Sequence, residues 1–224
     1  MNMIQLKSTP NHAGLSLKGT AAELDALLSA FGAVAGGAES VPAGLAAARS
    51  RVIGMRNRLN EQLRGAKSLG QEVATVKVFW PETIFVWAAL NNCIRQSYLS
   101  TKTPEWDLAV AAVRKFQNQV VDCLRMTVKD FSAARAFQAL STQTFLEDNY
   151  IVQFLDEQNC RHLALEGAEK RLGNLPVVTK LLIEQGSEYR KFKQSVLDAA
   201  RQHQISVEEI GFNSEYPKEQ DIIW

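Results

Sequence analysis

The sequence predicts an α+β protein that is predominantly α-helical, with a small antiparallel sheet packed on a multi-helix body. Two short runs of alternating apolar and polar residues lie near the start of the chain, on either side of a turn rich in proline, asparagine and glycine. A third β-type run precedes a long apolar helix, and most of the remaining chain has helical periodicity. The sheet is therefore expected to consist of a hairpin, 3–7 and 14–18, and one further strand, 75–79.

The helix that begins near Pro81 organises the rest of this prediction. Proline suits the first helical turn because that turn leaves its N–H groups unpaired. Residues 84–90 are apolar on every side, so this half of the helix is expected to lie in the middle of the body. The second half is polar. If it is buried as well, its side chains need internal partners or a ligand.

The chain is expected to form a single domain over residues 1–224. A hairpin and a first helix occupy 1–36, and a helical body that includes the third strand occupies 42–205. An acidic tail, 206–224, completes the chain and ends in three apolar residues, a cluster that usually packs on its own domain or on a partner.

Local signals suggest where the helices begin and end. Thr20 and Glu23 form a capping-box pattern at the start of the first helix, which Gly32 and the pair of Gly36 and Gly37 are expected to end. Thr103 and Pro104 are expected to begin a helix that continues to residue 128. The other helices are expected at 42–63, 131–140, 145–165, 167–172, 174–185 and 187–203.

Composition argues against several classes of protein. The formal net charge of +1 gives no global field for nucleic acid or an anionic membrane. Three widely spaced cysteines, Cys93, Cys123 and Cys160, favour buried free thiols in a reducing cytoplasm. No stretch approaches the roughly 18 apolar residues of a membrane span, and the N-terminal residues lack the apolar core of a signal peptide. We therefore expect a cytoplasmic protein, with no membrane contact, metal or cofactor.

The polar half of the central helix contains the first candidate site. Asn91, Arg95 and Tyr98 lie on one side of this helix, and Glu82 lies in its first turn. These four residues could line a pocket for an anionic ligand. Alternatively, Arg95 pairs with an acidic residue and Asn91 bonds a neighbouring backbone group. His12, in the hairpin turn, is expected to make local hydrogen bonds, since a general base needs a nearby carboxylate such as Glu82.

A basic helix contains the second candidate site. The segment 49–67 has six basic residues and one acidic residue. Arg49, Arg56 and Lys67 lie together beside its apolar stripe and could contact an acidic partner or a nucleic-acid backbone. The alternative is an ordinary solvated helix face.

Several motifs together resemble a known group of proteins. They are TPNHAG at 9–14, GTAAELDALLSAF at 19–31, VFWPETIFVWAALNNCIR at 78–95 and the ending from Leu197 to Trp224. The most specific part is the WPE…ALN…IR pattern at 80–95. This chain resembles an uncharacterised bacterial family of unknown function, and the resemblance implies an intracellular single-domain protein without assigned catalytic residues.

The sequence leaves three functions open. We favour a non-enzymatic cytoplasmic protein-interaction module, with a protein partner or a homodimer, because the chain lacks the signatures of nucleotide-binding loops, zinc proteases and nucleophile elbows. The alternative is a small-molecule or nucleotide-handling enzyme with a pocket near Glu82, Asn91 and Arg95. A weaker alternative is nucleic-acid binding through the basic helix 49–67.

Overall fold

A three-stranded antiparallel sheet forms where the alternating patterns predicted it, in the computed structural model of the chain. Its strands are β1 (Gln5–Ser8), β2 (Gly14–Thr20) and β3 (Val73–Phe79), in the order β1-β2-β3. Leu17 on β2 pairs with Leu6 on one side and with Val76 on the other. At Gly14, a Cβ atom would lie 2.1 Å from the carbonyl oxygen of Val78, so only glycine fits this close approach of two strands.

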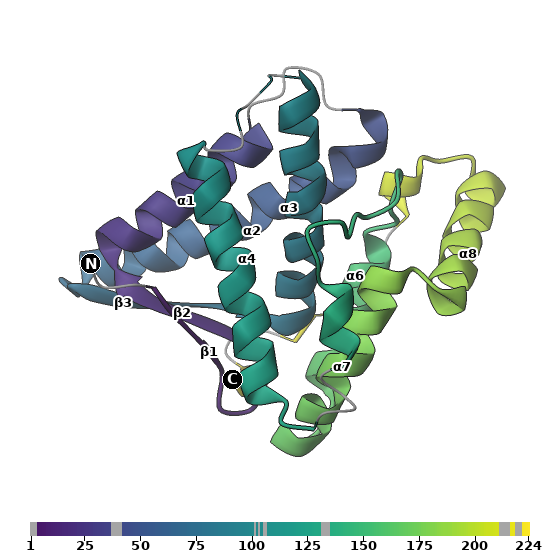
Figure 1. Ribbon diagram of the computed structural model, residues 1–224. Coiled ribbons are helices and arrows are strands. Elements are labelled where there is room, and N and C mark those ends of the chain that lie inside the picture. Colours follow the sequence, from purple (N-terminus) through teal and green to yellow (C-terminus); the bar gives the residue numbers. More distant parts are fainter. Residues whose placement is uncertain are drawn as a thin grey trace.

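Helices make up most of the fold, so the prediction of a mainly helical α+β protein is confirmed. The structure describes residues 4–36, 42–100, 102, 104, 107–130, 135–210, 216–217 and 221–224. The helices are α1 (Ala21–Gly36), α2 (Ala46–Ser68), α3 (Trp80–Ser100), α4 (Leu108–Thr127), α6 (Gln153–Ala164), α7 (Ala168–Glu184) and α8 (Ser187–His203). Short 3₁₀ turns are η1 (Ala43–Leu45), η2 (Arg135–Ala139) and η3 (Val207–Glu209). Figure 1 shows α1, α2 and α4 near the sheet, with α6, α7 and α8 on the other side of α3.

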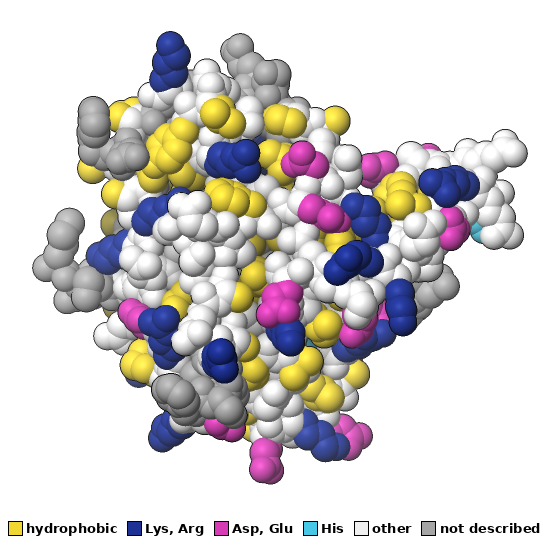
Figure 2. Space-filling view, turned by 45° about the vertical axis from the view of Figure 1, so that its right-hand side comes forward, with side chains coloured by type: hydrophobic (Ala, Val, Ile, Leu, Met, Phe, Trp, Pro, Cys, Tyr) yellow, Lys and Arg dark blue, Asp and Glu magenta, His cyan; other side chains and the backbone are white. Residues whose placement is uncertain are grey.

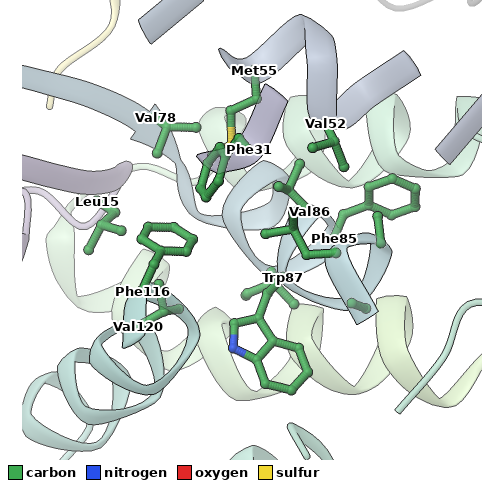
Figure 3. Packing of buried hydrophobic residues seen from close by; sticks show 14 of the residues in the cluster. Leu15, Phe31, Val52, Met55, Val78, Phe85, Val86, Trp87, Phe116 and Val120 are labelled. Carbon is green, nitrogen blue, oxygen red and sulfur yellow. The ribbon is translucent and has the colours of Figure 1, made fainter. Parts of the chain in front are cut away.

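Helix α3 lies in the middle of the body, as its apolar sequence predicted. It contacts five other helices, α1, α2, α4, α6 and α7, and both β2 and β3. Fourteen of its 21 residues are buried. Figure 3 shows Phe85, Val86 and Trp87 pointing from α3 into different parts of the surrounding core. The indole Nε1 of Trp87 donates a hydrogen bond to the backbone oxygen of Gln117 on α4 (3.0 Å), so this polar atom is satisfied inside the core.

Most of the buried hydrophobic side chains form one cluster, which extends from Leu15 on β2 to Val196 on α8. Phe31 of α1 packs edge-to-face on Phe116 of α4, with ring centroids 5.1 Å apart. Burial of each large apolar side chain contributes about 1.5–3 kcal/mol, so this cluster is the main source of stability.

Two predicted helix starts have clear outcomes. The capping box at the start of α1 is confirmed, because Thr20 N donates to the Glu23 carboxylate (2.9 Å) and Glu23 N donates to the Thr20 hydroxyl (3.3 Å). Of the glycines expected to end this helix, Gly32 lies inside it, and α1 ends at Gly36. Gly37 and Thr103 lie outside the described residues. Asp107 caps α4 instead, by accepting hydrogen bonds from two backbone N–H groups.

Other helix boundaries differ because long-range contacts override local pattern. The predicted helix 145–165 begins only at Gln153, since the backbone before it bonds distant groups, such as the Tyr189 hydroxyl at Ile151 N (3.1 Å). The two predicted helices on either side of residue 173 are one helix, α7, which continues through Pro176. Residues 131–134 of another predicted helix lie outside the described residues, and 135–139 form η2.

Candidate functional site

Glu82, in the first turn of α3, belongs to a buried network of charged and polar groups. The residue is 2% exposed. Arg58 of α2 donates from Nη2 to Glu82 Oε1 (2.6 Å), and Asn159 of α6 donates from Nδ2 to Oε2 (3.3 Å). A buried carboxylate needs such compensation, because transfer of an unpaired charge out of water is very unfavourable.

A second carboxylate, Asp156 of α6, extends the network. It forms an ion pair with Arg51, which lies two turns before Arg58 on α2. The hydroxyl of Tyr216 donates to Asp156 Oδ1 (2.7 Å) and accepts from Asn159 Nδ2 (2.9 Å). Burial, together with the hydrogen bond to Asp156, raises the pKa of Tyr216, so its phenol stays protonated. The network thus joins α2, α3 and α6 to Tyr216. We use the term C-terminal segment for the described residues 216–217 and 221–224.

A cavity of about 570 Å³ lies beside this network, between α2, β3 and the C-terminal segment. We call it the α2–β3 pocket. Met55 and Leu59 of α2, Phe79 of β3, and Tyr216 and Trp224 supply much of its apolar wall. Its size falls within the roughly 300–1,000 Å³ of small-molecule sites, which combine apolar walls with a few polar groups.

Three aromatic rings of the pocket form a nearly parallel stack. The Phe79 ring stacks with Trp224, at a centroid distance of 5.2 Å and an interplanar angle of 14°, and with Tyr216, at 6.4 Å and 17°. The Lys77 ammonium group lies 5.3 Å from the centre of the Trp224 ring. The side-chain amide of Gln62 donates to the backbone oxygen of Lys77 (3.0 Å) and accepts from its N–H (2.7 Å), so α2 fixes the outer edge of β3 here.

The C-terminal segment is fixed beside the hairpin, where Figure 1 marks the end of the chain. Asn11 donates from Nδ2 to the Trp224 backbone oxygen (2.9 Å), and Arg171 of α7 donates from Nη1 to that of Ile223 (2.7 Å). The hairpin turn is itself bound to α6, because the His162 ring donates from Nε2 to the His12 backbone oxygen (2.8 Å). Burial lowers the pKa of His162 to about 4, so its ring is neutral at pH 7.

The structure does not bring the predicted polar pocket together. Glu82 is nine residues, or about 13 Å of helix, before Asn91. Asn91 donates from Nδ2 to the backbone oxygens of Ser141 (3.1 Å) and Thr144 (2.7 Å), and it accepts from Gln117 Nε2 (3.0 Å). These bonds match the alternative in which Asn91 binds neighbouring backbone.

The other two residues of that predicted pocket lie near the surface. Arg95 is exposed, and its guanidinium group lies 5.2 Å from the centre of the Phe145 ring, so its described partner is aromatic and not acidic. Tyr98 lines a separate hollow beside Arg114. His12 bonds the Ser8 hydroxyl (2.8 Å), the local contact expected of a turn histidine.

The predicted anionic-partner surface of α2 is used for internal contacts. Arg49 donates to backbone oxygens at the end of α1, and Arg56 donates to that of Leu28 (3.0 Å). Lys67 forms an ion pair with Asp25. On the face shown in Figure 2, basic and acidic side chains are interspersed with small hydrophobic patches and form no continuous basic stripe. The α2 residues that line the pocket, Arg51 among them, lie on another side of the helix.

In the part of the chain that the structure describes, no group of three or more His, Cys, Asp or Glu side chains could hold a metal ion. The three cysteines form no disulfide, and burial raises the pKa of Cys93 to about 11, which keeps that thiol protonated. Among the described helices, none has the length and apolar character needed to cross a membrane.

Fold and pocket together define a class: a mainly helical α+β protein in which a small sheet and a basic helix enclose a pocket with aromatic walls. Residues 4–224 match the family described as a domain of unknown function (DUF6904), and the chain belongs to this family. No curated protein and no solved structure matches the chain significantly.

Proposed function

We propose that this protein is a non-enzymatic binding protein and that its ligand enters the α2–β3 pocket. The observation that supports this proposal is a cavity of about 570 Å³ whose wall combines three stacked aromatic rings with basic side chains. Aromatic rings supply a large apolar contact area, and a few polar groups then fix the orientation of a ligand.

The state of the polar groups favours binding over catalysis. Glu82 and Asp156, the carboxylates next to the pocket, are bound to Arg58 and Arg51. Burial raises the pKa of Tyr216, which donates a hydrogen bond to Asp156 and keeps its proton. A general base must be free to accept a proton from the substrate near the working pH, and these ion-paired groups are unsuited to that role.

A protein partner is the second candidate occupant of the same pocket. Arginine, tyrosine and tryptophan dominate the binding energy of protein interfaces, and Arg58, Tyr216 and Trp224 all line this cavity. In this version a side chain of a partner, or of a second copy of the chain, fills the pocket. A cytoplasmic location is part of the proposal, since cysteines that form no disulfide suit a reducing compartment.

A blocked pocket provides the test. Glu61 lies on the rim of the pocket and is exposed, so Glu61→Trp places an indole at the entrance without disturbing the core. Glu72→Trp, at an exposed position that does not line the pocket, is the matched control. Thermal shift against a library of metabolites and aromatic fragments measures binding, and size exclusion with light scattering measures self-association.

The proposal predicts compounds that raise the Tm of the wild type and of Glu72→Trp but not that of Glu61→Trp. If Glu61→Trp alone shifts a dimer to a monomer, the second candidate is supported. Both versions are contradicted if no compound in the library raises the Tm and light scattering shows that the wild type and both variants are monomers.

A further inference from the structure

We infer that the α2–β3 pocket binds a flat aromatic molecule that has an anionic oxygen group, either a carboxylate or a phosphate. This inference rests on the proposed function and adds the chemical class of the ligand. Its evidence is the shape of the aromatic wall and the unused donors beside it.

The wall favours a flat ligand. The planes of Tyr216 and Trp224 are within 17° and 14° of the Phe79 plane, so three rings already lie almost parallel. Tyr216 is 40% exposed although its hydroxyl is held by the buried network. A planar aromatic ligand can extend this stack at a low cost in conformational entropy, because the three rings of the protein are already ordered.

The donors favour an anion. The Arg58 side chain is 54% exposed, and only its Nη2 has a hydrogen bond, to Glu82, within the described residues. The Lys77 ammonium group has no acceptor among those same residues, and its described partner is the Trp224 ring. Against these two cations, Glu61 is the single carboxylate among the described residues that line the pocket.

These groups match what an anionic oxygen requires. Arginine can bind a carboxylate or phosphate through two parallel N–H groups, and lysine adds a point charge. The Gln62 amide bonds the Lys77 backbone, so the Lys77 side chain projects from a fixed point of β3. Cations and rings that line one cavity therefore select a ligand with charge and aromatic surface together.

Matched probes separate the two components by calorimetry with the full chain. 2-Naphthoate, 2-naphthamide and 2-naphthylmethylammonium share one ring system and differ in charge, while adenosine 5′-monophosphate and adenosine test phosphate as the anionic group. We expect at least one anion to bind with a Kd about tenfold lower than its neutral counterpart, because charge-assisted hydrogen bonds exceed neutral ones.

The variant Lys77→Gln tests the assigned donor. The backbone contacts of Lys77 do not involve its side chain, so the fold should be preserved. Lys18→Gln is the matched control, because Lys18 is exposed on the neighbouring strand and does not line the pocket. We expect Lys77→Gln to weaken the bound anion about fivefold or more and to leave the neutral probe unchanged, whereas Lys18→Gln changes neither.

The outcomes distinguish this inference from the proposed function. Binding of neutral probes as tight as that of anions, or a preference for the cation, overturns the anionic class and leaves the pocket as a binding site. An anion preference that survives Lys77→Gln also overturns the assignment. If none of the five probes binds and the metabolite library also contains no stabiliser, the proposed function fails as well.

Discussion

The two ends of α3 bury polar side chains in different ways. At its start, Glu82 meets a guanidinium group, an amide and, through Asn159, the hydroxyl of Tyr216, all beside an open cavity. Nine residues later, Asn91 meets backbone oxygens, the Gln117 amide and the guanidinium group of Arg114. Asn91 itself lines neither the α2–β3 pocket nor the hollow beside Arg114. The first network pairs carboxylates with guanidinium groups beside the α2–β3 pocket. The second is centred on an uncharged amide, and its one guanidinium group, that of Arg114, has no carboxylate partner among the described residues.

This difference shows which buried polar groups are structural. The Asn91 network fixes the segment 141–144 against α3, and its bonds are complete without a ligand. The Glu82 network retains unused capacity, because Arg58 is half-exposed and has spare N–H groups within the described residues. We therefore interpret the buried Asn91 amide as a structural group, and we propose that the ion pair at the edge of the cavity belongs to a binding site.

The comparison assumes that both ends of α3 belong to one folding unit, and we propose that the chain is a single domain because one hydrophobic cluster includes them. We expect urea to unfold the whole chain in one cooperative transition. Tryptophan fluorescence and far-ultraviolet circular dichroism should then give the same midpoint. Two separate midpoints would contradict a single domain.

Among substitutions in the two polar networks, Asn91→Ala should have the largest effect. It removes the Asn91 hydrogen bonds to the backbone oxygens of Ser141 and Thr144, and it removes one acceptor of the Gln117 amide. We expect a loss of about 3–4 kcal/mol in unfolding free energy. Urea denaturation measures this loss. Gln96→Ala, on the less buried part of the same helix, is the control and should cost about 0.5 kcal/mol or less. If Asn91→Ala and Gln96→Ala lowered the unfolding free energy equally, the amide network would have no structural role.

Acid should weaken the Glu82 end through His162, which lies on α6 with Asp156 and Asn159. Its pKa is about 4 in the folded protein and 6.5 ordinarily, so the unfolded chain binds the proton first. The unfolding free energy should therefore fall between about pH 6.5 and pH 4, by up to roughly 3 kcal/mol. His162→Gln should flatten the urea stability profile over this range, whereas His203→Gln, an exposed histidine, should not. An unchanged profile in His162→Gln contradicts this assignment.

Tyr216→Phe should have a smaller effect, confined to the charged end. It removes the hydroxyl that joins Asp156 to Asn159, at a cost of about 1–1.5 kcal/mol in urea unfolding. Tyr98→Phe, at the other end of α3, is the matched control and should cost little, because this side chain lies at a surface hollow and not in the buried network. A larger cost for Tyr98→Phe would reverse the assignment of the two tyrosines.

Local sequence patterns predicted the parts of the fold that local chemistry decides. The capping box of Thr20 and Glu23, the hairpin and the burial of α3 all follow from spacing within a few residues. The start of α6 did not, since it depends on Tyr189, 38 residues from Ile151. Pattern alone cannot detect such a partner.

The candidate site was predictable only in part. Glu82 was singled out, and Arg51 and Arg58 were recognisable as basic residues outside the stripe that contains Arg49 and Arg56. The contacts of Tyr216 with Asp156 and Asn159 span 60 and 57 residues, and no motif in the sequence connects them. Only the fold brings the end of the chain against α2 and β3.

The indole N–H signals of the four tryptophans offer the most direct test of the α2–β3 pocket. The protein is labelled with ¹⁵N and titrated with the probe that binds most tightly of the five, and the signal is assigned through Trp224→Phe. We expect the Trp224 signal to move in a saturable way. The signals of Trp80 and Trp87, whose N–H groups are bonded to the Ser8 hydroxyl and the Gln117 backbone, should stay in place. A titration that saturates with Trp224 unmoved, or that leaves all four signals unchanged, would contradict the account.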